Sequence, residues 1–257
     1  MWFVRYLRLM QACLEAICVV WIQFPRMTQA KKLAAVQSWS CKVLAVIGVK
    51  LVVDQRSCLS PVSAAPRLWV ANHVSWLDIL VIQAIHPCVF VAKSEVAHWP
   101  IVGHLAKACG VIFVDRQGAM GARQMVQQVI DALSQGLCVA AFPEGTTSPG
   151  QSVGVFHANL FEAVIHHRLA VQPIALRYSD LQSGAWCAKV AYVDDMDLMS
   201  SLHQVLKIGG IRADVGLGEP LAASGHSRRT LAHLSHQTVC AHLRALQQSH
   251  EFSLFVS

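Results

Sequence analysis

Charged residues are scarce in this chain, and acidic ones are almost missing from its first fifth. Only 14% of the 257 residues are Asp, Glu, Lys or Arg, whereas 54% are hydrophobic. Residues 1–50 hold seven basic side chains against Glu15 alone, which accounts for the whole net charge of +6. A nucleic-acid-binding protein usually carries its basic excess on the folded domain. This placement therefore predicts no nucleic-acid partner and favours an anionic membrane surface.

The chain also lacks the residue spacings of disulfide-bonded and metal-binding proteins. Its nine Cys are scattered singly from Cys13 to Cys240, with no C-x2-C pair, and its thirteen His show no metal-ligand spacing. Most of these Cys lie in apolar runs, which is typical of reduced, buried thiols in a protein that faces the cytoplasm. We therefore expect no metal site and no resident cofactor.

No apolar run is long enough for a comfortable transmembrane helix. The run Leu9–Phe24 has 16 residues, or about 24 Å of helix, whereas a span needs about 20 residues. The polar residues in and around this run fall in one stripe of a helix and are Arg5, Arg8, Gln11, Glu15, Gln23 and Arg26. Pro25 marks the expected end of this helix, and a second, weaker helical pattern follows it.

These patterns predict a membrane-associated two-helix hairpin over residues 1–56. We expect it to lie in one leaflet at the cytoplasmic face of the inner membrane, with its Lys and Arg side chains reaching lipid phosphates. Three alternatives stay open, namely a single transmembrane span, a cleaved signal peptide, and packing of both helices on the domain's own core.

Beyond the turn-rich linker Ser57–Pro66, short apolar strands alternate with helical stretches. The expected strands are Leu68–Ala71, Cys88–Ala92, Val111–Val114, Leu137–Phe142, Val171–Arg177, Trp186–Val193 and Ala213–Gly216. The expected helices are Ser75–Ile85, His98–Ala108, Ala119–Gln135, Val155–His166 and Ser227–Gln247. This alternation predicts that residues 57–257 form an α/β domain with a mostly parallel, mixed sheet flanked by helices. No helix is expected between the last two strands, so they are read as a mixed or antiparallel continuation.

A His and an Asp follow the first of these strands, in Asn72-His73-x4-Asp78. His is well suited to take up a proton near neutral pH, and an Asp within reach can fix its tautomer. Ser75-x-x-Asp78 also fits a helix capping box, which is the structural alternative for the same residues. The two interpretations are compatible. If the helix starts at Ser75, His73 lies in the preceding loop and can fold back over Asp78.

Polar residues follow the next three strands as well, and strand ends of an open α/β sheet are where ligands bind. Lys93 follows the second strand and can stabilise a developing negative charge. Arg116 follows the third and offers bidentate hydrogen bonds to an anion. The loop after the fourth strand contributes Glu144, Gly145, Thr146 and Thr147. Glu144 is expected to orient Arg116 or to hold a substrate hydroxyl, and the loop can bind phosphate and glycerol oxygens. Each of these residues also has a structural alternative. Arg116 can form a salt bridge, Lys93 can lie on the surface, and the loop can be a plain polar turn.

A general base, an anion clamp and a membrane hairpin together favour one reaction. In it, His73 deprotonates the hydroxyl of a phosphate-bearing lipid, which attacks an activated acyl group. The chain here resembles the 1-acylglycerol-3-phosphate acyltransferases, the phospholipid/glycerol acyltransferase family. Four motifs carry the resemblance, namely Asn72-His73-x4-Asp78, Gly110-x-x-Phe113-Val114-Asp115-Arg116, Phe142-Pro143-Glu144-Gly145-Thr146-Thr147-Ser148 and Val171-Gln172-Pro173-Ile174. Residues 156–160 lack the basic side chains that members often carry after the third motif.

The resemblance implies a glycerol-3-phosphate acyltransferase-like fold with His73 as base and Asp78 as its partner. It implies that Arg116, Lys93 and residues 144–147 hold the acceptor, and that acyl-CoA or acyl carrier protein is the donor. The expected reaction acylates the sn-2 hydroxyl of lysophosphatidic acid and yields phosphatidic acid, a step of phospholipid biosynthesis. The alternatives are acylation of a lyso-aminolipid such as lyso-ornithine lipid, thioester hydrolysis, and a non-catalytic membrane-binding role.

Overall fold

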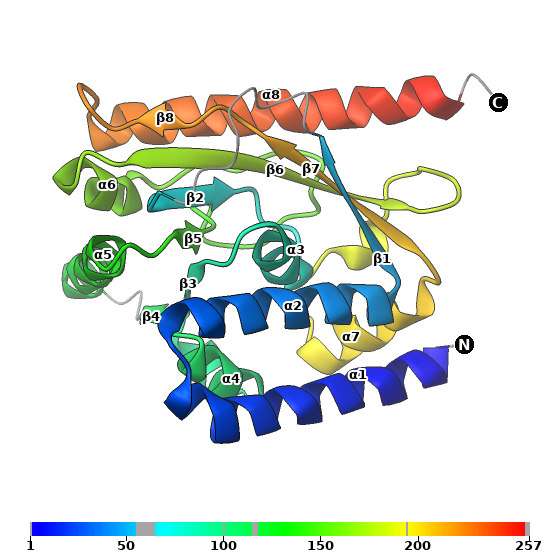
Figure 1. The fold of residues 1–257 in the computed structure, drawn as a ribbon. Helices are drawn as coiled ribbons and strands as arrows, with labels where there is room; N and C mark the ends of the chain where they lie inside the picture. Colours follow the sequence, from blue (N-terminus) through cyan, green and yellow to red (C-terminus); the bar gives the residue numbers. More distant parts are fainter. Residues whose placement is uncertain (1, 55–64, 100, 115–117, 194, 255–257) are drawn as a thin grey trace.

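One eight-stranded sheet runs through the molecule, with helices on both of its faces (Figure 1). The computed structural model describes residues 2–54, 65–99, 101–114, 118–193 and 195–254. The strands are β1 (Val49–Asp54), β2 (Arg67–Ala71), β3 (Val89–Lys93), β4 (Ile112–Val114), β5 (Val139–Ala141), β6 (Ala170–Asp180), β7 (Ile211–Leu217) and β8 (Leu221–Ala222). The helices are α1 (Trp2–Cys18), α2 (Gln29–Ile47), α3 (Leu77–Ile85), α4 (Val102–Ala108), α5 (Gly118–Ser134), α6 (Glu162–His166), α7 (Leu198–Lys207) and α8 (Arg228–Leu254).

The sheet is mixed and mostly parallel, which confirms the predicted fold class. Its order is β1-β7-β6-β2-β5-β3-β4, and β8 pairs with β6. Among the described strands only the β6–β7 and β6–β8 pairs are antiparallel. Helices cross over between β2, β3, β4 and β5, and such crossovers are what parallel neighbours require. The carboxyl ends of these strands therefore lie at one edge.

Side chains of the central strand β2 alternate between two apolar layers. Leu68 and Val70 point into a core shared with α5, α6 and α8. Trp69 and Ala71 point into a second core shared with α2, α3 and α7. Every residue of β2 is buried, as expected for a parallel strand that is covered on both faces. In Figure 1, α8 lies above β6, α5 lies to the left of β5, and α2 lies below β3.

Three elements near the C-terminal third differ from the sequence-based prediction, and one of them is the short strand β8, which was not expected. The expected strand Trp186–Val193 is wrong, because this segment makes a single bridge from Trp186 to Ser179 and then a 3-10 turn at Ala188–Val190. Helix α7 follows it, where no helix was expected. Its start carried a readable signal, since the side chain of Asp197 accepts a hydrogen bond from the Ser200 N–H at 2.9 Å as an N-cap.

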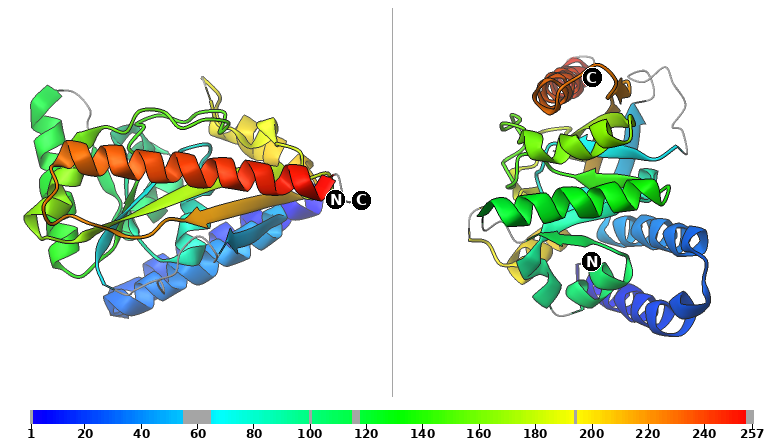
Figure 2. Two further views of the ribbon diagram at one scale, coloured as in Figure 1. Left: turned by 90° about the horizontal axis from the view of Figure 1, so that it is seen from above. Right: turned by 90° about the vertical axis from the view of Figure 1, so that its left-hand side faces the viewer.

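The N-terminal helices form a hairpin whose two arms have different surroundings (Figure 2). Helix α1 continues through a π-helical turn and a 3-10 turn that ends at Arg26, next to Pro25. Helix α2 returns along α1, packs on α3 and buries Val43, Leu44 and Ile47 in the core. Strand β1 then pairs with β7, so part of the segment assigned to the hairpin belongs to the sheet.

Contrary to the expectation from the 16-residue apolar run, the N-terminal segment contains one helical stretch that is long and apolar enough, by length and composition, to cross a membrane. It runs over Trp2–Arg26, and 17% of its most apolar window is buried. The core packing of α2 corresponds to one of the alternatives left open above. Helix α1 and the π-helical turn after it keep a large exposed apolar surface.

Candidate active site

His73 and Asp78 meet in the loop that joins β2 to α3. Strand β2 ends at Ala71 and α3 begins at Leu77, so His73 lies in an irregular segment that folds back over the first helical turn. The His73 Nδ1 atom lies 2.8 Å from Asp78 Oδ2. The same oxygen accepts the backbone N–H groups of Val74 at 2.7 Å and Ser75 at 2.9 Å. The carboxylate of Asp78 is fully buried.

One half of the expected capping box is present. Asp78 reaches back to the Ser75 N–H, as the acidic member of such a box does. The Ser75 hydroxyl is buried and has no hydrogen-bond partner among the described residues. One carboxylate therefore both closes the helix start and holds the imidazole.

The imidazole of His73 is held on its flat side too. It stacks on the Phe142 ring with centroids 3.8 Å apart and an interplanar angle of 6°. Because Nδ1 faces a carboxylate, that nitrogen carries the proton in the neutral ring, and Nε2 is the nitrogen that can accept one. In the described part of the chain, no hydrogen bond involves Nε2.

Strand β6 fixes this loop through two contacts that sequence reasoning missed. The Asn72 side chain exchanges two hydrogen bonds with the backbone of Leu176, at 2.9 and 2.8 Å. The Tyr178 hydroxyl donates to Asp78 Oδ1 at 2.7 Å. These partners lie about a hundred positions from the loop, and the available signal was a Tyr directly after the expected strand Val171–Arg177.

The loop after β5 is bound to the backbone around His73. Glu144 is buried, and its two oxygens accept the N–H groups of His73 and Gly154, each at 2.7 Å. The Ser148 N–H donates to the carbonyl of His73 at 2.8 Å, and the Thr147 hydroxyl donates to the carbonyl of Tyr192. Burial raises the pKa of the Glu144 carboxyl, while the two N–H donors partly offset that effect.

The expected binding residues have different positions. Lys93 is exposed at the end of β3, and Thr146 is exposed in the loop after β5. Gly145 adopts φ 75°, a left-handed conformation that favours glycine in this turn. Arg116 lies outside the described residues, so its relation to Glu144 is not described.

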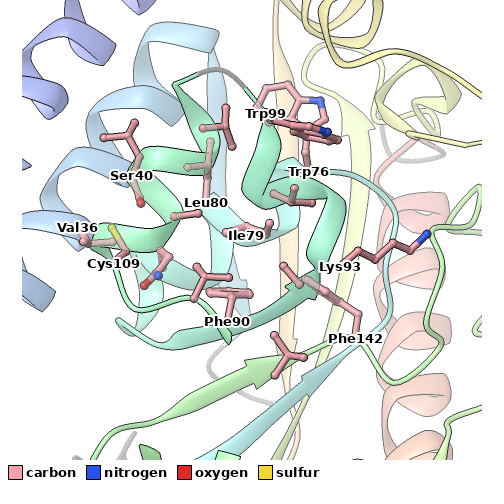
Figure 3. Close-up of a pocket in the computed structure, with 18 of the residues that line it drawn as sticks. Val36, Ser40, Trp76, Ile79, Leu80, Phe90, Lys93, Trp99, Cys109 and Phe142 are labelled. Carbon is pink, nitrogen blue, oxygen red and sulfur yellow. The ribbon is translucent and has the colours of Figure 1, made fainter. Parts of the chain in front are cut away.

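A large apolar cavity of about 1740 Å³ opens beside this site. His73, Lys93 and residues 142–147 line one part of it, and α1, α2, α3, α4, α5 and α7 contribute to the rest of the wall. Figure 3 shows Ile79, Leu80 and Phe90 grouped inside, with Lys93 directed away from them. Burial raises the pKa of Cys109, also in this wall, to about 11, so its thiol is not a nucleophile near neutral pH. The structure therefore brings His73, Lys93 and residues 144–147 to one cavity.

A G-x-S-x-G spacing occurs at residues 150–154 and needs a separate explanation. In many hydrolases this pattern places a nucleophilic Ser at a sharp turn between a strand and a helix. Here Ser152 is exposed in an irregular segment, with neither a strand before it nor a helix after it. Gly154 instead donates to Glu144. This segment does not form a nucleophile elbow.

The fold and the site together define an α/β protein in which a His, paired with a buried Asp, borders a large apolar cavity. The family profile described as Acyltransferase matches residues 55–177. A lyso-ornithine lipid O-acyltransferase of Brucella abortus is 34% identical over 197 residues, which are 72% of this chain and 72% of that protein. The chain belongs to the acyltransferase family.

Further relatives carry two different names. A lyso-ornithine lipid O-acyltransferase of Pseudomonas aeruginosa is 37% identical over 174 residues, 68% of this chain and 66% of that protein. A 1-acyl-sn-glycerol-3-phosphate acyltransferase of Neisseria meningitidis is 35% identical over 152 residues, 59% of this chain and 58% of that protein. This chain thus spans less than two thirds of each of these two relatives.

A solved structure has the same fold. The crystal structure of the 1-acyl-sn-glycerophosphate acyltransferase PlsC from Thermotoga maritima superposes with a TM-score of 0.68 and 19% sequence identity. The match covers 96% of this chain and 98% of that one. At this identity the likeness concerns the fold alone.

Proposed function

We propose that this protein transfers a fatty acyl group from a thioester donor to the free hydroxyl of a lyso-lipid. One observation carries the proposal. A His whose Nδ1 is held by a buried carboxylate borders a cavity large enough for lipid chains. His73 and Asp78 are the proposed catalytic residues, and acyl-CoA or acyl carrier protein is the proposed donor.

In the proposed step, His73 Nε2 takes the proton of the acceptor hydroxyl, and the oxygen of that hydroxyl attacks the thioester carbonyl. The tetrahedral intermediate collapses as the C–S bond breaks, and the imidazolium returns the proton to the leaving thiolate. The products are an ester and a free thiol. General base catalysis of this kind contributes about 10²- to 10⁴-fold to the rate. Asp78 keeps the proton on Nδ1 and stabilises the imidazolium.

The proposed binding groups are Lys93, Arg116, Gly145, Thr146 and Thr147. Lys93 borders the cavity and is able to interact with an anionic part of either substrate. We do not propose a direct contact between Glu144 and the substrate. Both of its oxygens already accept backbone N–H groups, so we assign it to holding the His73 backbone in place.

Lyso-ornithine lipid is the first acceptor candidate. Relatives of that name are 37% and 34% identical to this chain. The described cavity wall carries charges of both signs, with Lys93 as well as Glu95 and Asp195. An ornithine head group carries one amine and one carboxylate, whereas a phosphate is repelled by carboxylates.

Lysophosphatidic acid, the acceptor expected from the sequence, is the second candidate. The relative from Neisseria meningitidis, at 35% identity, favours it. For both acceptors we propose that the protein works at the cytoplasmic face of the inner membrane, on an anionic lipid surface. The exposed apolar side chains of α1 support a membrane location.

An acceptor screen on the full chain tests the proposal. Purified protein receives labelled acyl-CoA or acyl carrier protein, with each acceptor in turn. The comparison includes His73→Ala and the matched control His226→Ala, which changes an exposed His outside the cavity wall. We expect transfer to lyso-ornithine lipid that only His73→Ala abolishes.

The other outcomes separate the alternatives. Transfer to lysophosphatidic acid alone shows that this lipid, and not lyso-ornithine lipid, is the acceptor. Thioester consumption at full rate without any acceptor indicates a hydrolase. A His73→Ala variant as active as the wild type overturns the proposed mechanism.

A further inference from the structure

The hydroxyl of Tyr178 is placed to control the carboxylate that holds His73. Tyr178 lies on β6 and is 3% exposed, and its Oη atom donates to Asp78 Oδ1 at 2.7 Å. We propose that Tyr178 is a positioning residue for the base, in a hydrogen-bonded chain Tyr178–Asp78–His73. This inference rests on the proposed function, because it gives Tyr178 a role in the same reaction.

The two oxygens of Asp78 accept hydrogen bonds from different groups. Oδ2 accepts three bonds, from His73 Nδ1 and from the N–H groups of Val74 and Ser75. Oδ1 accepts from Tyr178, and no other described residue donates to it. The carboxylate plane turns about the Cβ–Cγ bond of Asp78, which moves both oxygens, so a donor on Oδ1 adds a second restraint to the bonds on Oδ2. The bond to Oδ1 fixes the plane and satisfies an oxygen that is otherwise buried without a partner.

Tyr178 serves as a donor at every pH relevant to the reaction. Burial and the adjacent Asp78 carboxylate raise the pKa of its hydroxyl well above the ordinary value of 10. The hydroxyl therefore keeps its proton and shares the negative charge of Asp78. Among the described residues, Glu144 is the other titratable group near Asp78 and His73. It lies in the loop after β5 and accepts the His73 N–H.

The same strand also aligns the other side of the loop. Leu176, two residues before Tyr178 and thus on the same side of β6, exchanges both of its backbone hydrogen bonds with Asn72. Strand β2 has already ended there, since its last paired residue is Ala71 opposite Ile174. Strand β6 therefore holds the residue before His73 through Leu176 and the partner of His73 through Tyr178.

The test compares Tyr178→Phe with Ser179→Ala. Each substitution removes one hydroxyl from a buried side chain of β6, but the Ser179 hydroxyl has no partner among the described residues. For Tyr178→Phe we expect kcat to fall about tenfold to hundredfold with KM unchanged, since a hydrogen bond to a charged group is lost. We also expect the acidic limb of the pH–rate profile to move to higher pH. Without the hydroxyl, Asp78 stabilises the imidazolium more strongly, so His73 becomes neutral at a higher pH. Ser179→Ala should match the wild type in both measurements.

A titration of His73 by ¹⁵N NMR, assigned by subtraction of a His73→Gln spectrum, needs no substrate. Its midpoint should move in Tyr178→Phe as the acidic limb does. Replacement of Tyr178 by 3-fluorotyrosine retains the ring and strengthens the donor, so the midpoint should move to lower pH. If Tyr178→Phe fails to fold, the 3-fluorotyrosine variant tests whether the Tyr178 hydroxyl controls His73.

Unchanged midpoints in these variants overturn the role of Tyr178, whatever the activity. A wild-type protein without transfer to any acceptor overturns the proposed function, while the titration still decides whether Tyr178 controls His73.

Discussion

At the scale of single residues, His73 has almost all of its polar groups engaged. Its N–H donates to Glu144, its carbonyl accepts from Ser148, and its Nδ1 faces Asp78. The two carboxylates are buried, and the bonds described for them come from N–H and O–H groups. A ring held in this way presents Nε2 to the cavity without reorganisation, which is how a preorganised site lowers a barrier.

Burial also sets the charge state of a His far from the site. His86 ends α3, packs on Trp69 with centroids 5.0 Å apart, and has a pKa lowered below the ordinary 6.5 by burial and by the positive charge of Arg67. A lowered pKa means that the unfolded chain takes up the proton first as the pH falls. The contribution of His86 to stability is therefore fully present above about pH 6.5 and decreases as the pH falls toward the pKa of His86 in the folded protein.

We predict that the free energy of unfolding decreases between pH 7 and pH 5, and that His86→Phe reduces this slope. Urea unfolding at several pH values measures it, with His226→Phe as the control at an exposed position. His242 also has a pKa lowered by burial, so some slope should remain in His86→Phe. A slope identical to that of the wild type would contradict the assignment to His86.

The residues predicted from the sequence were those that stand close together along the chain. His73 and Asp78 are five positions apart, and the capping pattern indicated how they meet. Tyr178 and Leu176 escaped prediction because their contacts depend on the register of β6 against β2. The double use of Glu144 escaped it as well, since one of its partners is a backbone N–H on another strand's loop.

At the scale of elements, the loop after β5 depends on Gly154 for its contact with Glu144. A Cβ atom at this position would lie 2.7 Å from Glu144 Oε2. Such a contact is too short, so the carboxylate that holds the His73 N–H must move. A small displacement of a catalytic group has a large effect on the rate.

We predict that Gly154→Ala lowers kcat roughly tenfold to hundredfold with little change in the thermal midpoint. The matched control is Gly136→Ala, because Gly136 has φ +79° and nothing within 4 Å of its added Cβ. That variant carries only backbone strain of about 1 kcal/mol and should retain full activity. Equal kcat in the two variants would show that the Gly154–Glu144 contact does not govern the base.

Element prediction succeeded where one pattern covered a whole helix or strand. The central strands and the helices between them follow from apolar runs bounded by turn residues. Helix α7 was missed although Asp197 caps it, because a short amphipathic segment beside an apolar run reads equally as a loop. Strand β1 was taken into the hairpin, since the sequence of Val49–Asp54 does not show that its partner is β7, far along the chain.

At the scale of the whole molecule, two polar side chains of helix α1, Arg5 and Glu15, contact other helices of the protein. Glu15 pairs with Lys42 of α2, and Arg5 donates to the carbonyls of Leu206 and Gly209 near the end of α7. Leu7 and Leu14 of α1 are exposed by 52% and 59%, and Trp21 and Ile22 of the π-helical turn that continues it are exposed by 72% and 61%. The residues that α1 buries, Leu9 and Ala12, are apolar too, so this helix carries apolar side chains on its core side as well as on its exposed side. The sequence predicted the two faces of α1, but only the position of α2 shows which face is exposed.

We predict that Leu14→Glu and Trp21→Glu each lower binding to phosphatidylglycerol-containing vesicles about tenfold, because each removes a side chain whose transfer to lipid is worth about 1.5–3 kcal/mol. Met120→Glu is the control, since Met120 is 74% exposed on α5, which packs on the opposite face of the sheet. Co-sedimentation measures binding, and circular dichroism checks that the fold is retained. Added salt should weaken wild-type binding too, because the N-terminal basic residues interact with anionic lipid over about 10 Å. If the variant carrying both substitutions binds as the wild type does, the exposed face of α1 does not contact the membrane, and another surface must bring His73 to its lipid acceptor.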